Sequence, residues 1–413
     1  MSEFFLHRQV MGKVGMNEQR ISTALAIGAI VAGCGFLLLN PLRLAFIANS
    51  FIPFLFFNVA IMLVCGVLFI LRSNVIKVRP VELVLCLSVL CTALMTNYTG
   101  RSPIDVVIDF LRPILFLTVI IFFRNYVDLD RFASSKSARI WLKATAWVTL
   151  IAVLASWLIS RYVVPLYPAY ASIDSIFGLA WLLATGSGFS QLLYMLVLIV
   201  SGKRGVYLAG FVVLLLCYRY KRLALPWWIS LVGIACFIWL LAVLNLDVLA
   251  SVFLKSNTEL PNDASGIINL LSGGRIEELR GAIAAIHTPL EYFFGAGLGF
   301  AFKVDGFEDA SGLHRNLHFT PASLAIYYGV PFVVVFTYYL AGFFGDALRL
   351  IRRGASPIIY SYAVYCIASM VFLFTEFSVF AYVNFAISCG IVSAAANEMR
   401  RLDGEIAVFR TVV

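Results

Sequence analysis

Long apolar runs dominate the chain and set its fold class. Several reach the roughly 20 residues that a helix needs to cross the hydrocarbon core of a membrane. A transmembrane β-barrel would instead show segments of about ten residues with alternating hydrophobicity. The pattern predicts an all-α, polytopic membrane protein with a single transmembrane domain over residues 1–413. The clear spans lie at about 21–39, 51–71, 81–98, 106–123, 141–160, 225–246, 320–347, 357–375 and 379–396.

The middle of the chain is harder to assign. Residues 163–200 fit one long span or two short ones broken near 185–188, and residues 205–218 form a further short apolar segment. Cytoplasmic loops carry an excess of Lys and Arg, and the basic cluster at 219–222 is cytoplasmic only if 163–200 crosses twice. Two crossings predict about 12 spans with both termini in the cytoplasm. They also predict short, broken or tilted helices at 163–200.

One long loop, about residues 247–319, falls on the outer, periplasmic face in this topology. Apolar residues recur there at the spacing of an amphipathic helix, at Ile276, Leu279, Ile283 and Ile286. Ser272 can cap this helix and Thr288-Pro289 would end it, after which the glycine-rich segment 295–299 would form a flexible turn. The loop also holds three of the four histidines, His287, His314 and His318.

Composition and charge exclude several classes of protein. Hydrophobic residues make up 62% of the chain and charged residues 13%, and the mean hydropathy is +0.93. A soluble domain carries about 25% charged residues, so an ordinary soluble, disordered or fibrous protein is excluded. Positive cytoplasmic loops explain much of the net charge of +9, and no basic stripe with interleaved aromatic residues indicates a nucleic-acid partner. The eight cysteines lie in apolar runs without metal-ligand spacing, so we expect no disulfides.

Common motifs of metal-dependent and nucleotide-dependent catalysis are missing. The chain contains no HExxH, Walker A, GxSxG or zinc-ligand spacing. Asp128-Leu-Asp130 is similar to the metal-binding triplet of many sugar transferases, but the topology places it in a cytoplasmic loop, where a solvated role is the simpler interpretation. The first outer loop, about 40–50, has no acidic residue that could hold a metal ion. We therefore expect no metal site and no cofactor.

Basic residues on the outer face are the strongest candidates for chemistry, because the positive-inside rule disfavours them there. Lys203 and Arg204 stand between apolar runs, and Arg275 opens the loop helix. The guanidinium group bonds phosphate oxygens in pairs and keeps its charge, which suits a lipid pyrophosphate at the membrane surface. Histidine exchanges a proton near neutral pH, so His318, at the end of the loop, is the candidate base.

These arguments give two sets of candidate residues. The catalytic set is His318, Arg204 and Arg275. The substrate-binding set is Lys203, Arg280, His314, Arg315, Arg112 and Arg161. Arg112, beside Pro113 at the edge of a span, and Arg161, at the start of an outer loop, are explained equally well as side chains that snorkel to the headgroups.

Three stretches of the chain resemble the family of O-antigen polymerases and O-antigen ligases, over about residues 160–350. The first, Ser201-Gly-Lys-Arg-Gly205, is similar to the family's Ser-Arg-Gly segment. The second, residues 272–299, is similar to the family's outer-loop stretch, in which an Arg opens an amphipathic helix and a Gly-rich turn follows.

The third stretch surrounds the candidate base. His318 precedes Gly329 by eleven residues, as the family's His-Asn precedes its Glu-Leu-Gly. Here Phe319 replaces the Asn, and Tyr327-Tyr328 replaces the Glu-Leu. These departures leave the acceptor open, and they favour a polymerase slightly over a ligase.

The resemblance implies a GT-C-like, metal-independent, inverting glycosyltransferase in the bacterial inner membrane with a periplasmic active site. The donor would be an undecaprenyl-pyrophosphate-linked oligosaccharide. Arg204 and Arg275 would neutralise the pyrophosphate leaving group, and His318 would activate the acceptor hydroxyl. The acceptor would be a second lipid-linked glycan for a repeat-unit polymerase, or lipid A–core for a ligase. Further implied partners are membrane lipids and a chain-length regulator protein.

A polysaccharide or lipid transporter or flippase is the alternative from another class. Such a protein would be expected to show paired halves and ionisable groups at mid-membrane. The chain has few charges inside its apolar runs and no internal repeat, but it has a charged outer loop of about 70 residues. The transferase is therefore favoured.

Overall fold

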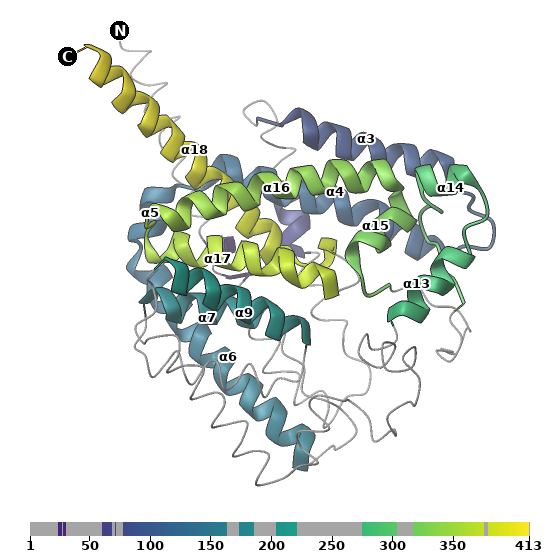
Figure 1. Cartoon of the computed structure of the whole chain (residues 1–413), viewed down its shortest axis with the longest axis horizontal. Helices are drawn as coiled ribbons and strands as arrows, with labels where there is room; N and C mark the ends of the chain where they lie inside the picture. Colours follow the sequence, from purple (N-terminus) through teal and green to yellow (C-terminus); the bar gives the residue numbers. More distant parts are fainter. Residues whose placement is uncertain are drawn as a thin grey trace.

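The computed structural model of the chain describes residues 24–26, 28–29, 60–67, 71, 77–162, 173–185, 204–220, 275–303, 317–375 and 379–412. Within these residues the chain folds into a bundle of helices (Figure 1). The α-helices are α3 (Pro80–Met95), α4 (Pro103–Tyr126), α5 (Leu129–Ser134), α6 (Lys136–Tyr162), α7 (Asp174–Thr185), α9 (Arg204–Arg219), α13 (Arg275–Ala284), α14 (Pro289–Phe294), α15 (Thr320–Tyr328), α16 (Val330–Arg352), α17 (Pro357–Phe372) and α18 (Val383–Val412). Two 3₁₀ turns, η2 (Leu373–Thr375) and η3 (Val379–Ala381), follow α17. The all-helical prediction is confirmed for these parts of the chain.

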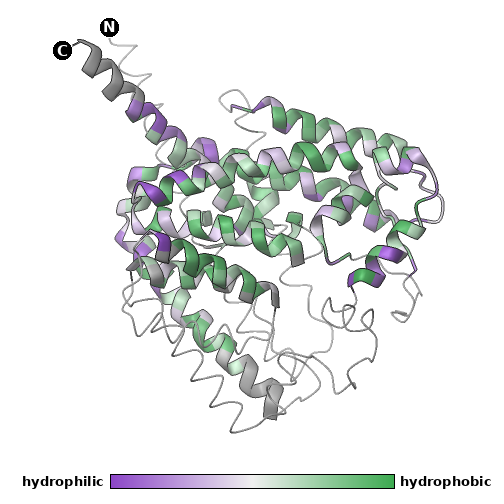
Figure 2. Cartoon of the chain, viewed as in Figure 1, coloured by the Kyte–Doolittle hydropathy of each residue, from purple (hydrophilic) through white to green (hydrophobic). Residues whose placement is uncertain are grey.

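Helix α17 lies inside the bundle and packs against α7, α9, α16 and α18. Its sequence is apolar on nearly all sides, which is typical of a helix that buries its whole circumference. Every residue from Ile358 to Ser369 is buried. Figure 2 shows hydrophobic residues through the middle of the bundle and hydrophilic residues gathered toward its ends.

Helix α18 approaches α4 closely because Gly390 has no side chain. A Cβ atom at Gly390 would lie 2.6 Å from Phe123 Cβ and 2.8 Å from the Ile120 carbonyl oxygen. Small residues let helix backbones approach in this way inside membranes. The contact fixes α18 in the bundle, and the C-terminal turns of α18 extend beyond it (Figure 1).

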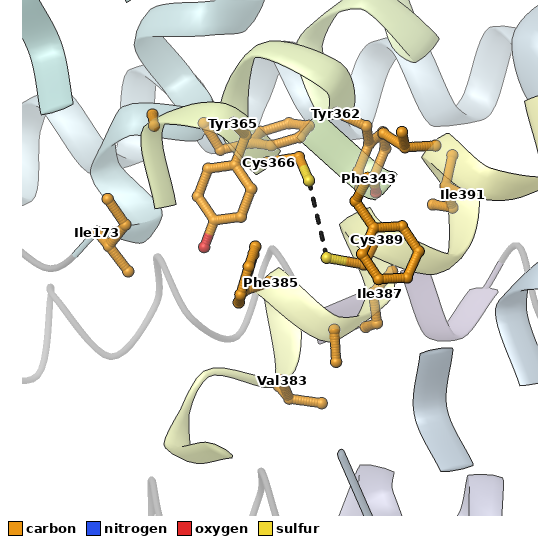
Figure 3. Close-up of a cluster of buried hydrophobic side chains, with 14 of the residues drawn as sticks. Ile173, Phe343, Tyr362, Tyr365, Cys366, Val383, Phe385, Ile387, Cys389 and Ile391 are labelled. Carbon is orange, nitrogen blue, oxygen red and sulfur yellow. Dashed lines mark hydrogen bonds between the residues drawn. The ribbon is translucent and has the colours of Figure 1, made fainter. Parts of the chain in front are cut away.

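Helices α17 and α18 share a buried cluster of cysteine and aromatic side chains (Figure 3). The sulfur atoms of Cys366 and Cys389 lie 3.7 Å apart, and both residues are fully buried. Phe177 of α7 packs against the rings of Tyr362 and Tyr365 at centroid distances of 4.9 Å and 5.6 Å. The cysteines that the structure describes are all free thiols, Cys65, Cys86, Cys91, Cys366 and Cys389.

Two of the described helices, α4 and α16, have the length and apolar character needed to cross a membrane. Helices α3 and α17 are also apolar but have 16 residues each. The predicted spans at 81–98, 106–123, 141–160 and 357–375 coincide with α3, α4, α6, and α17 with η2. The described part of the chain is therefore helical, and it is compatible with a helical membrane protein.

The prediction of a single span at 320–347 is wrong. The structure breaks this segment at Gly329, between α15 and α16, where φ is +86°. The apolar pattern hides the break because both helices are apolar. Glycine permits it because glycine alone adopts a positive φ at no steric cost. The last predicted span, 379–396, also differs, because it begins with η3 and continues through α18 to Val412.

The predicted loop helix is present as α13, but it ends earlier than expected. It begins at Arg275 and ends at Ala284. Thr288-Pro289, predicted to end this helix, instead begins α14. Thr288 Oγ1 accepts a hydrogen bond from the Glu291 N–H at 3.2 Å, and the Glu291 carboxylate accepts one from the Thr288 N–H at 3.0 Å. This reciprocal capping box fixes the start of a new helix.

Several predictions fall on residues outside the described ranges. They include the span at 225–246, most of the spans at 21–39 and 51–71, and the first part of the long loop. Helix α7 is the described part of 163–200. Its 12 residues extend about 18 Å, so the short helix expected in this region is confirmed, while the number of crossings there stays a prediction.

Basic residues gather at one end of the bundle. We call this the basic end and define it by Arg79, Arg124, Arg352, Arg353 and Arg400. Arg353 pairs with Asp403 at 2.6 Å and Arg400 with Asp346 at 2.7 Å, which joins α16 to α18. Arg352 Nε donates a hydrogen bond to the Tyr220 hydroxyl at 3.0 Å. Arg219 and Tyr220 are the described residues of the 219–222 cluster, and they therefore lie at the basic end. The side of the membrane on which this end lies stays a prediction.

Candidate functional site

The other end of α16 carries the candidate site. We call this the histidine end and define it by Arg275, Gly295, His318 and Gly329, which belong to α13, α14, α15 and the connections next to them. Figure 1 shows these three short helices together at one end of the long helices.

His318 lies just before α15 and is held by Glu278 of α13. The backbone N–H of His318 donates to Glu278 Oε2 at 2.9 Å, and its ring Nδ1 lies 3.0 Å from Oε1 and 3.1 Å from Oε2. The Glu278 side chain is 5% exposed, whereas the His318 side chain is 38% exposed. The carboxylate therefore fixes the imidazole ring while the ring keeps access to the surface.

The carboxylate also decides which ring nitrogen can act as a base. With the Nδ1–H donating to Glu278, Nε2 carries the lone pair of the ring and is the nitrogen that could act as a base. In a catalytic triad, a carboxylate in this position stabilises the imidazolium that forms when the histidine acts as a base. A histidine oriented in this way by a carboxylate is the usual arrangement of a general base.

Helix α13 places Glu278 and Arg275 close to each other. Residues three or four apart lie on one face of a helix, so Arg275, Glu278 and Ala282 share a face. Glu278 and Ala282 are buried, and Ala282 packs with Leu317 and Ile326 in a small apolar cluster of the histidine end. Arg275 therefore lies one helical turn from the carboxylate that holds His318.

Two glycines allow the end of α14 to pack closely against the break between α15 and α16. Gly295 has φ +84° and Gly329 has φ +86°. A Cβ atom at Gly295 would lie 2.5 Å from the Tyr327 carbonyl oxygen, and one at Gly329 would overlap the Phe293 carbonyl oxygen. Other residues would be strained at these φ values and would also force the two segments apart.

Arg101, in the connection between α3 and α4, holds the glycine-rich turn 295–299. Its Nη1 and Nη2 donate to the carbonyl oxygens of Leu298 and Ala296 at 2.5 Å and 2.7 Å. Thr96 Oγ1 accepts a hydrogen bond from the Leu298 N–H at 3.1 Å, and Asp109 Oδ2 accepts one from the Gly299 N–H at 2.8 Å. The predicted turn is present, and its glycines allow it to pack closely against α3 and α4.

The charges around this turn are partly removed from solvent. Burial lowers the pKa of the Arg101 guanidinium from its usual value, and the nearby Glu291 carboxylate opposes that shift. A hydrogen bond from the His287 backbone N–H lowers the pKa of Glu291. Glu291 therefore stays ionised and bound to the start of α14.

Arg204 is the first residue of α9. The last residues of α9 lie beside Tyr220 at the basic end, and a helix of 16 residues extends about 24 Å. The 3₁₀ turn η2 packs against both α9 and α15, so it is a shared neighbour of the two helices. The side chain of Arg204 lies outside the described residues, as do Lys203, His314 and Arg315.

The remaining candidates are spread over the bundle. Arg280 is 70% exposed on its side chain and pairs with Glu277 at 3.3 Å. Arg161 is the second-to-last residue of α6, and its side chain is not described. The prediction that Arg112 lies at the edge of a span is wrong, because α4 begins nine residues earlier, at Pro103.

Sequence reasoning misses Glu278 as the partner of His318. An acidic residue in the first turn of a helix, such as Glu278 in α13, is ordinarily explained by the positive charge of that helix end. The predicted apolar stripe is Ile276, Leu279, Ile283 and Ile286. Leu279 and Ile286 do pack in the cluster around Ala282, but Ile283 is 45% exposed, and Glu278 shares the buried face of the helix. A signal did exist, because a carboxylate beside the apolar stripe of a helix costs free energy unless it is paired.

We expect Gly329→Ala to destabilise the histidine end. Backbone strain at a positive φ costs about 1–3 kcal/mol, and the added methyl group would overlap the Phe293 carbonyl oxygen. Thermal unfolding of the purified protein in detergent measures the loss. Gly342→Ala in α16 is the control, because no atom lies within 4 Å of a Cβ at that position. Equal unfolding temperatures for the two variants would contradict the role of Gly329.

No protein-family model matches the chain, and no curated protein matches it significantly. A function for the chain therefore rests on its residues and on their arrangement at the histidine end.

Proposed function

We propose that the protein is a membrane-embedded glycosyltransferase that acts on lipid-pyrophosphate-linked glycans at the periplasmic face, as a repeat-unit polymerase or an O-antigen ligase. The observation that carries this proposal is the His318–Glu278 pair, held one turn from the arginine that opens α13. The pair provides an oriented base, and Arg275 provides a permanent positive charge near it. Glycosyl transfer without a metal ion needs both.

In the proposed reaction the acceptor hydroxyl attacks the donor sugar as its bond to pyrophosphate breaks. Such a reaction passes through a state that resembles an oxocarbenium ion. His318 Nε2 takes the hydroxyl proton, and Glu278 stabilises the imidazolium. Arg275 and Arg204 stabilise the negative charge that grows on the departing pyrophosphate, which lowers the energy of the transition state more than that of the ground state.

An apolar pocket next to His318 supports a lipid-linked substrate. The pocket has a volume of about 260 Å³ and lies between α15, α16, the end of α17 and η2. It begins at Thr320 and Pro321, two and three residues after His318, and its walls are almost entirely apolar, with Leu324, Val333, Phe336, Leu340, Phe344 and Phe374 among them. A hydrocarbon chain matches such walls because burial of apolar surface is favourable.

The orientation in the membrane is part of the proposal. We place the basic end in the cytoplasm and the histidine end in the periplasm, with about 12 spans and both termini cytoplasmic. The arginines of the basic end support this placement, because cytoplasmic ends carry the excess of Lys and Arg. The opposite placement would put Arg352, Arg353 and Arg400 outside.

A deletion strain tests the function and separates the two reactions. Lipopolysaccharide and lipid-linked glycans are profiled in the deletion strain and after complementation with the wild-type gene. Single repeat units on the core would identify a lost polymerase. Bare core with polymer retained on the lipid carrier would identify a lost ligase. We expect the first outcome, and unchanged glycans in the deletion strain would contradict both assignments.

We expect sugar transfer by the purified protein to continue in excess EDTA. In the proposed mechanism Arg204 and Arg275 provide the positive charge that a metal ion provides in other transferases. Transfer of a labelled sugar from a lipid pyrophosphate donor measures the activity before and after chelation. Loss of activity in EDTA and recovery with Mg²⁺ or Mn²⁺ would contradict this role of the arginines.

A further inference from the structure

Helix α14 exposes an apolar surface at the histidine end. Leu290 is 69% exposed, Phe293 is 55% exposed and Tyr292 is 48% exposed. We call these three residues the α14 patch. The other side of α14 packs against α3, α15 and α16, so the patch is the outward side of a helix that is fixed in place.

The patch carries no charge from its own helix. Glu291 is the charged residue of α14, and its Oε2 accepts hydrogen bonds from the backbone N–H groups of His287 and Thr288 at 2.7 Å and 3.0 Å. These bonds hold the carboxylate at the N-terminal end of the helix. The outward surface of α14 therefore consists of leucine, tyrosine and phenylalanine side chains and carries no charged side chain of this helix.

We propose that the α14 patch inserts into the outer boundary of the lipid bilayer and holds the histidine end at the membrane surface. The patch lies next to further exposed apolar residues on the helices that α14 contacts. Leu94 and Met95, at the end of α3, are 85% and 67% exposed, and Val330, at the start of α16, is 51% exposed. Helix α16 is one of the two described helices with the length and apolar character of a span, so its lipid-facing surface would continue onto α14.

The composition of the patch fits the interface of a bilayer. Tyrosine is enriched at the level of the headgroups because its ring is apolar and its hydroxyl is polar. A short amphipathic segment with aromatic and leucine side chains binds at this depth through its buried apolar area.

A second copy of the chain fits the patch less well than lipid does. A stable protein interface buries roughly 800 Å² on each partner. An aromatic side chain can bury about 150–250 Å², and Tyr292 and Phe293 have only about half of their surfaces exposed. The patch therefore falls well short of the area that a stable dimer needs.

The consequence for catalysis rests on the proposed function. At Gly295 and Gly329, α14 packs closely against the break at the end of α15, and His318 lies just before the other end of α15. Insertion of α14 would therefore hold His318 at a fixed depth, level with a pyrophosphate group attached to a lipid in the outer leaflet.

Photo-crosslinking in vesicles tests the insertion. The full-length protein carries benzoylphenylalanine at position 293 and is placed in phosphatidylethanolamine–phosphatidylglycerol vesicles. We expect lipid adducts after illumination, detected by mass spectrometry. Position 338 on α16, where Tyr338 is 74% exposed, is the positive control, and position 287, at the exposed polar residue His287 between α13 and α14, is the negative control. A cross-link from position 293 to a second copy, or no lipid adduct there while position 338 forms one, would overturn the proposal.

A substitution separates insertion from catalysis. Phe293→Asp is expected to reduce the lipid adduct formed by a probe at position 292 to the level of the position 287 control, with the unfolding temperature kept as evidence that the fold is intact. His318→Ala should leave the adduct unchanged. Adducts that persist in Phe293→Asp would overturn the insertion. Normal glycans in the deletion strain would instead overturn the proposed function and leave the insertion in place.

Discussion

His318→Ala is expected to slow sugar transfer by about 10²–10⁴-fold, the usual contribution of a general base. The loss should fall on kcat and leave donor affinity near the wild-type value, because a base acts in the transition state. Purified protein, a labelled lipid pyrophosphate donor and separate measurements of binding and turnover test this expectation. Wild-type amounts of polymer or ligated glycan from His318→Ala would show that the histidine is not the base.

A substitution of Glu278 tests the same prediction in a second way. Glu278→Gln keeps the shape of the side chain but removes the charge that stabilises the imidazolium. Its turnover should lie between those of the wild type and His318→Ala, and donor binding should again be unaffected. His287→Ala is the matched control, since His287 is an exposed histidine on the same loop with no contact to Glu278 among those that the structure describes. A defect in His287→Ala equal to that in His318→Ala would point to a general effect on the loop.

The helices of this protein are predictable because their signal is local. A run of apolar residues indicates that a segment is buried or faces lipid. Such runs predict the approximate ranges of α3, α4, α6, α9 and α17. The break at Gly329 is not predictable in the same way. The Phe293 carbonyl group, 36 residues earlier in the chain, leaves no room for a side chain at Gly329, and the apolar pattern continues through the break.

The candidate site is only partly predictable for the same physical reason. His318 and Arg275 can be predicted as site residues because histidine can act as a base and arginine can bind a pyrophosphate group. Their geometry depends on contacts between distant segments, since Glu278 lies 40 residues before His318, and Arg101 lies 195 residues before Ala296. A pattern of hydropathy along the chain carries no information about such pairs.

The basic end shows a related difference between prediction and structure. The predicted span at 106–123 ends just before Arg124, which would place Arg124 in the loop that follows. In the structure Arg124 belongs to α4, and its side chain is 4% exposed beside a Glu82 side chain that is 0% exposed. The apolar run ends at residue 123, but the helix continues for three more residues because Arg124 has a buried carboxylate to bind.

Glu82 is the centre of a hydrogen-bonded network that joins four helices, α3, α4, α16 and α18. Its carboxylate accepts hydrogen bonds from both Nη atoms of Arg124, with Nη2 at 2.9 Å from Oε2, and from the Tyr339 hydroxyl at 2.7 Å. The backbone N–H of Arg79 donates to the same carboxylate at 2.8 Å. Arg79 in turn donates to Ser393 Oγ of α18 at 2.7 Å. Every polar atom of the Glu82 side chain is therefore paired.

Glu82→Ala is expected to destabilise the protein by about 3–5 kcal/mol, the usual cost of removing one partner of a buried ion pair. The cost arises because Arg124 keeps its charge in a site that has no carboxylate. Unfolding of the purified protein in detergent measures the change. Asp403→Ala is the control, because its pair with Arg353 is about half exposed, and exposed pairs contribute little to stability.

A double variant separates the uncompensated charge from lost packing. Arg124→Met fills a similar volume without a charge, so Glu82→Ala with Arg124→Met should recover part of the stability lost in Glu82→Ala alone. Removal of both partners of a buried pair is less harmful than removal of one, because no charge is left without its partner. If the double variant is less stable than Glu82→Ala, the two losses add, and packing at the basic end, not the charge of Arg124, determines the effect.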